Sequence, residues 1–143
     1  MMDRQTRALQ RFVEAQDTVY QDVLLELRAG RKRSHWMWFI FPQLEGLGSS
    51  AMAQRYAIAS AAEAQAYLRH PVLRERLVQC TLLMLEYAEK TPNEILGSPD
   101  DLKFFSCMTL FDAVSEKGSP FKQALDVFFD GQREEKTLAL LAA

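Results

Sequence analysis

Helix-start signals recur along this chain, and they constrain its fold more than any other feature of the sequence. The pairs Ser60/Glu63 and Thr91/Glu94 have capping-box spacing, in which the first side chain accepts from the third helical N–H and the glutamate reaches back. His70-Pro71 and Ser119-Pro120 place proline at the first helical position, where its missing N–H costs nothing. The predicted helix starts are residue 4, Asp17, Ser60, His70, Thr91, Ser98 and Ser119. Gly30 is predicted to end the second helix, and Asp130-Gly131 the helix that starts at Ser119. Leu138 and Leu141 anchor a last amphipathic segment.

Strand signals are nearly absent. Only residues 36–41 form a strand-like run, and a lone strand has nothing to pair with. A chain of 143 residues suits one domain and buries enough surface to fold without disulfides or metal. We therefore predict a single all-α domain over residues 1–143, with roughly seven or eight short helices.

The segment from about 99 to 116, PDDLKFFSCMTLFDAVSE, is apolar most of the way round a helix. Such a helix is usually central, so we expect the others to pack around it. Four polar residues, Lys103, Ser106, Thr109 and Asp112, follow one another at three-residue spacing. This spacing drifts by about 60° per step on an α-helix, which predicts a slanting row rather than a straight stripe.

Composition and charge exclude several classes of protein. The net charge of -2 argues against broad nucleic-acid binding, which normally needs a basic face. The N-terminus lacks the apolar core of a secretory signal, and no apolar run reaches the length of a membrane span. Cys80 and Cys107 lie within apolar helical patterns and are predicted to be free thiols. We expect a cytoplasmic protein with no nucleic-acid or membrane partner.

Familiar cofactor and metal motifs are missing from the sequence. There is no CxxC, no HExxH and no GxxxxGK[ST]. The glycine-rich GLGSS at 46–50 has no strand before it, so we discount it as a phosphate loop. Two histidines and two cysteines are scattered without ligand spacing. We predict neither a metal nor a cofactor.

Three segments carry a family resemblance: HWMWFIFPQ, AYLRHPVL and SPDDLKFFSCMTLF. With them, nearly the whole chain resembles a small, mostly bacterial family catalogued as domain of unknown function 1810. The resemblance implies a multihelical fold and brings no established activity, cofactor or catalytic residue. Members more often carry a second serine at the position of Cys107, so a paired hydroxyl beside Ser106 is not implied here.

The stretch RKRSHWMWFIFPQLEGLG, residues 31–48, allows two interpretations. Its aromatic residues could simply fill the core, with Ser34 capping a short helix that Pro42 ends. Alternatively, Trp36 and Trp38 form the wall of a pocket, to which His35 and Gln43 add polar groups. Binding sites typically combine apolar walls with a few convergent polar groups.

Two groups of cations are also ambiguous. Arg28, Arg31, Lys32 and Arg33 follow a predicted helix, where cations are favourable, and are either a solvated helix end or a steering patch for an anion. Lys103 sits within the central helix. It either reaches the surface or pairs with an acid such as Asp100, or else it serves as a base, nucleophile or anion clamp.

Three functional hypotheses remain from the sequence. The first is a module that binds a small anionic or planar ligand in an aromatic-lined pocket. The second is a hydrolase or transferase acting on a nucleotide-like substrate of the ADP-ribose type, an analogy of fold class alone. The third is a protein-interaction domain without a pocket. The predicted binding residues are His35, Trp36, Trp38, Gln43, Lys103 and Ser106; the sequence names no catalytic residue and no oligomeric state.

Overall fold

The structure of the protein, a computed structural model, describes residues 3–143. Within that range the chain forms ten helices and no strand; one isolated parallel bridge joins Leu44 and Ile58. The helices are α1 (Arg4–Asp17), α2 (Tyr20–Arg28), α3 (Met37–Ile40), α4 (Ala51–Arg55), α5 (Ala61–Arg69), α6 (Pro71–Leu85), α7 (Pro92–Leu96), α8 (Asp100–Ala113), α9 (Pro120–Phe129) and α10 (Glu135–Ala142). The all-α prediction is confirmed. The helix count exceeds seven or eight because α3, α4 and α7 have only four or five residues each.

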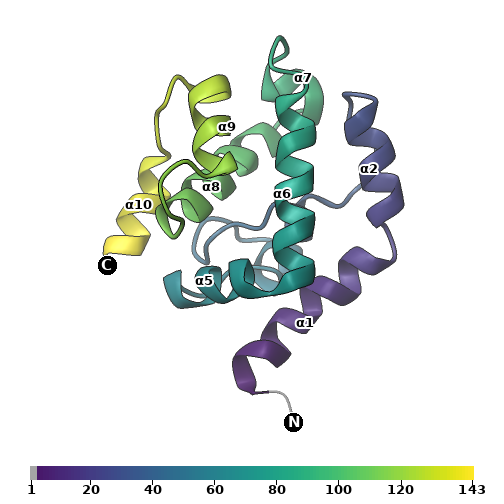
Figure 1. The fold of residues 1–143 in the computed structure, drawn as a ribbon. Helices are drawn as coiled ribbons and strands as arrows, with labels where there is room; N and C mark the ends of the chain where they lie inside the picture. The colour runs from purple at the N-terminus through teal and green to yellow at the C-terminus, as the bar shows by residue number, and fades with distance from the viewer. Residues whose placement is uncertain (1–2) are drawn as a thin grey trace.

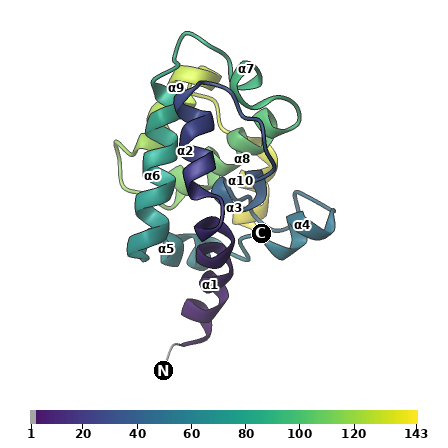
Figure 2. The same cartoon turned by 90° about the vertical axis from the view of Figure 1, so that its right-hand side faces the viewer.

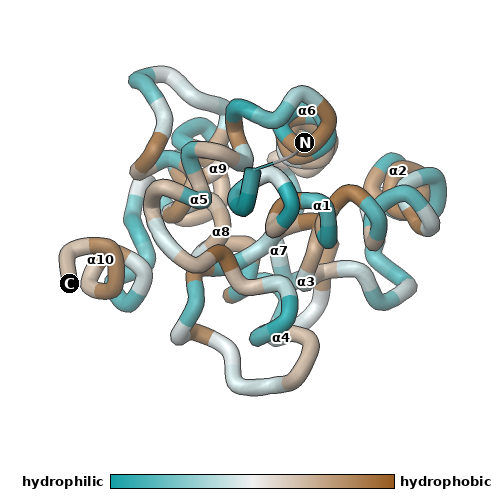
Figure 3. Tube along the Cα trace, turned by 90° about the horizontal axis from the view of Figure 1, so that it is seen from below, coloured by the Kyte–Doolittle hydropathy of each residue, from teal (hydrophilic) through white to brown (hydrophobic). Residues whose placement is uncertain are grey.

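Two helices organise the packing. The central α8 contacts α5, α7, α9 and α10, while the long α6 contacts α1, α2, α3, α5 and α9 (Figure 1). The N-terminus of α1 lies at one end of the molecule, and α4 lies at its periphery (Figure 2). Seen from below, α2 and α10 occupy opposite edges (Figure 3). One contiguous hydrophobic core runs beneath these helices.

The predicted central helix is confirmed as α8, one residue shorter at its start and three at its end than the sequence pattern suggested. Phe104, Cys107, Met108 and Phe111 are fully buried along it. The Phe104 ring meets the Phe41 ring edge-on, with 5.0 Å between centroids. Burial of these four side chains, which point to different sides of the helix, explains why apolar residues surround most of α8. Cys107 and Cys80 are both buried and free, as predicted.

Most of the helix-start signals act as the sequence indicated. His70 Nδ1 accepts hydrogen bonds from the first turn of α6, and Ser119 Oγ accepts from Lys122 N at the start of α9. Thr91 and Glu94 complete a full capping box. Ser60 caps α5, but the Glu63 carboxylate accepts from Ala59 N instead of closing the box.

Two predicted caps are wrong. Asp17 does not begin α2 but ends α1, and its carboxylate pairs with Arg76 Nη2 at 2.8 Å. The N-cap position of α2 is Val19, which makes no side-chain cap bond. Ser98 does not cap α8 either, because Pro99 occupies the N-cap position without a side-chain bond. Asp100 and Asp101 in the first turn still favour that helix end, since carboxylates interact well with exposed N–H groups.

A single buried amide connects several helices. Gln16, near the end of α1, is fully buried. Its Nε2 donates to Phe39 O at 2.7 Å in α3 and to Tyr67 Oη at 3.1 Å in α5, while its Oε1 accepts from Arg76 Nη1 at 3.3 Å in α6. Burying an amide is costly unless its hydrogen bonds are made, and here both ends of the amide are satisfied.

None of the helices in the described range has both the length and the apolar character needed to cross a bilayer.

Candidate functional site

The aromatic stretch of the sequence does not form a strand. Met37–Ile40 make the short helix α3, which begins after Trp36 and ends at Phe41. Ser34 does not cap it; the Ser34 hydroxyl instead donates to Glu26. The two tryptophans fall in different environments, because Trp36 is completely buried while Trp38 is partly exposed and packs on the edge of the core.

Glu26 fixes the segment that leads into this helix. Its Oε1 accepts from Arg33 N at 2.6 Å, Ser34 N at 2.9 Å and Trp36 Nε1 at 3.0 Å, and its Oε2 accepts from the Ser34 hydroxyl. Desolvation acts to raise the pKa of Glu26, but these hydrogen bonds outweigh it and lower the pKa to about 2. The carboxylate therefore stays ionised and holds the basic segment against the Trp36 indole.

The Glu26 network gives a prediction for acid stability. A carboxylate with a lowered folded pKa contributes stability that is present above its unfolded pKa of 4.5 and lost as pH falls toward 2. Wild type should lose about 1–2 kcal/mol more than Glu26→Gln when the pH drops from 5 to 3, less than the full pKa shift implies because solvent screens part of it. Urea unfolding at both pH values measures this. Equal losses in the two proteins would contradict the role assigned to the carboxylate.

Next to this segment, two lysines share one aspartate. Lys32 Nζ lies 3.0 Å from Asp100 Oδ2, and Lys103 Nζ lies 3.7 Å from Asp100 Oδ1. Each ammonium also lies over an indole: Lys32 is 5.2 Å from the Trp36 ring centroid and Lys103 is 5.5 Å from that of Trp38. Such contacts stabilise a cation on the ring face. We call these five residues the lysine–tryptophan cluster.

The position of Lys32 corrects its interpretation as a solvated helix end. Its side chain is only 9% exposed, and its backbone N–H donates to Ile95 O at 2.7 Å, which ties the segment to α7. Arg28, Arg31 and Arg33, the other members of the basic run, are exposed as that interpretation expects. The basic run therefore contains one buried cation, and its partner Asp100 lies on α8, too far along the chain for local spacing to reveal.

The structure brings Trp36, Trp38 and Lys103 together in the cluster, and among residues 3–143 none of the other predicted binding residues makes a side-chain hydrogen bond or ion pair with it. His35 is exposed. Gln43 is partly buried, and its carbonyl accepts from Ile58 N at 2.8 Å beside the Leu44–Ile58 bridge. The Ser106 hydroxyl donates to Glu134 Oε1 at 3.0 Å and so belongs to a different network.

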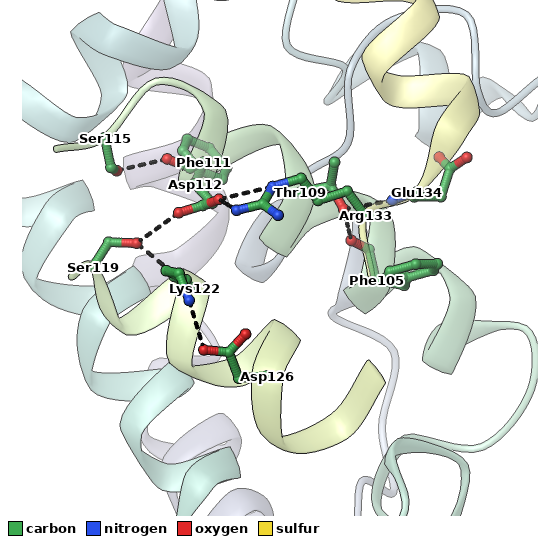
Figure 4. A network of polar contacts seen from close by, with 10 residues as sticks. All are labelled: Phe105, Thr109, Phe111, Asp112, Ser115, Ser119, Lys122, Asp126, Arg133 and Glu134. Atoms are coloured by element: carbon green, nitrogen blue, oxygen red, sulfur yellow. Dashed lines mark hydrogen bonds and ion pairs between the residues drawn. The ribbon is translucent and has the colours of Figure 1, made fainter. Parts of the chain in front are cut away.

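That network uses the polar row predicted on the central helix. Thr109 Oγ1 accepts from Glu134 N at 3.0 Å, and Asp112 Oδ2 pairs with Arg133 Nη2 at 2.8 Å (Figure 4). Together with the Ser106 bond, these contacts attach the start of α10 to α8. Ser106, Thr109 and Asp112 thus act in helix packing, whereas Lys103, one step earlier in the row, faces Trp38 and Asp100.

Three surface hollows lie away from the lysine–tryptophan cluster. The described residues form hollows of about 670, 600 and 570 Å³, and none of the six predicted binding residues lines any of the three. The proposal that these six residues line a pocket therefore stays a prediction. Among residues 3–143, no three His, Cys, Asp or Glu side chains gather closely enough to hold a metal ion.

The chemistry open to the cluster follows from its charges. Two ammonium groups face one carboxylate, so the cluster itself carries one uncompensated positive charge. The nearby Glu26 is ionised as well, and it is directed at residues 33–36 through its hydrogen bonds rather than at either lysine. Lys103, with a side chain 25% exposed, is the more accessible of the two cations and lies beside the partly exposed indole of Trp38. The arrangement can therefore attract an anion next to an aromatic surface.

Comparison with known proteins agrees with this helical architecture. The family described as "Protein of unknown function (DUF1810)" matches residues 6–141. The chain is also similar to the conserved hypothetical protein Rv1873 from Mycobacterium tuberculosis, whose crystal structure was determined at 1.38 Å. The two share 52% sequence identity over 94% of this chain and 96% of that one, with a TM-score of 0.92. No curated protein matches the chain. Because the family match spans nearly the whole sequence, the chain belongs to the DUF1810 family.

Proposed function

We propose that the protein binds a small anionic ligand with a planar group, and that the lysine–tryptophan cluster is its binding site. The observation that carries the proposal is that Lys32 and Lys103 share the single carboxylate of Asp100 while each lies on an indole. An anion bound at Lys103 would offset the remaining positive charge, and a planar group attached to it could pack on Trp38.

Binding ranks above the enzymatic alternative because of where the candidate acid–base groups lie. A hydrolase or transferase needs a base and an acid that converge on one substrate position. Lys103 is already engaged by Asp100 and Trp38, and His35 is exposed on the segment before α3. An interaction domain ranks lower, because the most accessible cation of the cluster, Lys103, lies beside a partly exposed indole, which suits a small planar anion.

Calorimetric titration with adenosine monophosphate, adenosine and inorganic phosphate tests the proposal. Wild type should bind adenosine monophosphate more tightly than either part alone. Lys103→Gln should weaken that binding about tenfold, because it removes one charge-assisted contact. Asp100→Asn should strengthen it, because both ammonium groups lose their competing carboxylate.

Lys122→Gln is the matched control, since Lys122 also pairs with an aspartate, Asp126 at 2.8 Å, but on α9. It should bind the nucleotide like wild type, and circular dichroism should show all variants folded. The proposal is wrong if wild type binds neither adenosine monophosphate nor phosphate, or if Lys103→Gln binds the nucleotide as tightly as wild type does.

A further inference from the structure

The hollow of about 670 Å³ lies between the corner of α5 and α6 and the loop that joins α8 to α9. Its volume is within the usual range for small-molecule sites. Gln65, Leu68 and Arg69 of α5 and Arg74 and Val78 of α6 line one side, and residues 114–121 line the other. None of the lysine–tryptophan cluster takes part in it.

Three cations surround this hollow: Arg69, Arg74 and Lys117. All three are exposed, and within residues 3–143 none has a carboxylate at ion-pair distance. By contrast, Arg76 on the same helix as Arg74 is paired with Asp17. Glu116 is the one acid in the lining, so the hollow has a clear positive excess that would favour an anionic group.

An apolar hollow of about 600 Å³ adjoins the basic one along α6. The two share Arg74 and Val78, so they meet at these side chains. Val78 and Leu82 are one helical turn apart on the same face, and Leu82 is 47% exposed. Pro71 and Leu83 complete the apolar wall. A ligand whose charged end lay in the basic hollow could therefore extend an apolar body along α6.

The acids along α6 set the orientation of such a ligand. Glu75 and Glu86 line the apolar hollow and would repel an anionic group placed there. The charge must then lie among Arg69, Arg74 and Lys117, and the apolar part must lie over Val78 and Leu82. We propose that these two hollows form one binding site for an amphipathic anion, with a carboxylate, sulfonate or phosphate head and an apolar body. The site is independent of the function proposed above.

Two fluorescent probes that differ in their charge test this inference. 1-Anilinonaphthalene-8-sulfonate carries an anionic head on an aromatic body, and N-phenyl-1-naphthylamine has a similar body without the charge. Wild type should bind the sulfonate saturably at one or more sites. The double variant Arg69→Gln/Arg74→Gln should bind it at least fivefold more weakly, while its affinity for the neutral probe stays within about twofold. Leu82→Ser should weaken the binding of both probes, because it removes apolar surface that both aromatic bodies would cover.

The matched control is Arg28→Gln/Arg31→Gln, which removes two exposed arginines at the end of α2 and should leave both probes unaffected. In a Lys103→Gln background the Arg69→Gln/Arg74→Gln substitutions should still weaken sulfonate binding at least fivefold, which separates this site from the lysine–tryptophan cluster. Far-ultraviolet circular dichroism checks that each variant is folded. The inference is overturned if wild type shows no saturable binding of the sulfonate, if the Arg69/Arg74 variant binds it like wild type, or if the Arg69/Arg74 substitutions have no effect in the Lys103→Gln background.

Discussion

Replacing Trp36 with alanine is expected to lower the free energy of unfolding by about 3–5 kcal/mol. The indole is completely buried, and it packs against the Phe41 ring with 6.4 Å between centroids. Its Nε1 donates to Glu26 and its face lies under the Lys32 ammonium. The substitution therefore opens a cavity and also removes a partner from two charged groups. Urea unfolding monitored by circular dichroism measures the change through a shift in midpoint.

Trp38→Ala is the matched comparison, because the second indole is only partly buried. Its cost should be about 1–2 kcal/mol, in proportion to the smaller apolar area that it removes from water. Trp36→Phe keeps most of the packing and loses the Nε1 bond, so its cost should fall between the two alanine variants. Equal costs for the two alanine variants would mean that both rings have the same role in the core.

Neutralising Asp100 is expected to have the next largest effect, about 2–3 kcal/mol for Asp100→Asn. The variant leaves Lys32, with a side chain 9% exposed, and Lys103 without their counter-charge. Removing one member of a largely buried pair costs more than the pair itself contributes, because the remaining charge stays desolvated. Adding Lys32→Met to Asp100→Asn should therefore recover much of the loss, since the methionine can remain packed on Trp36.

Asp126→Asn provides the control for that series. Its partner Lys122 lies one turn away on α9, and the two side chains are 50% and 46% exposed. Pairs this exposed contribute about 0.2–1 kcal/mol, so the control should change stability little. A loss for Asp100→Asn no larger than that of Asp126→Asn would show that the buried pair behaves like a surface one. Denaturant unfolding in low and moderate salt measures both.

The helices could be predicted where their signals are local. The capping residues His70, Thr91 and Ser119 contact backbone N–H groups within three residues, and all three begin helices as expected. Asp17 failed as a cap because α1 continues through it and α2 begins only at Tyr20, with Val19 at the N-cap position. Ser98 failed because the helix begins after the following proline without a side-chain cap. Local chemistry therefore predicts a helix start well only where the backbone actually leaves the helix at the capping residue.

In the candidate site, too, contacts between residues close in sequence could be predicted, and contacts between distant segments could not. The short spacing between Asp100 and Lys103 made their pairing foreseeable, and the structure places them 3.7 Å apart. The burial of Lys32 could not be foreseen, because it depends on the meeting of the α2–α3 segment with α7 and α8. Ser106 was grouped with the binding residues because it follows Lys103 in a polar row, but the drift of that row around the helix turns it toward Glu134.

The buried amide of Gln16 has a consequence for the uniqueness of this fold. A leucine in its place could fill a similar volume, but it would fit equally well if α1 were rotated or shifted by part of a turn. The amide is satisfied only where Phe39 O, the Tyr67 hydroxyl and the Arg76 guanidinium converge on it. Any other alignment of α1 leaves buried polar groups unpaired, and their desolvation penalty then falls on the misaligned states. Gln16 thus discriminates between the native arrangement and competing arrangements of the same helices.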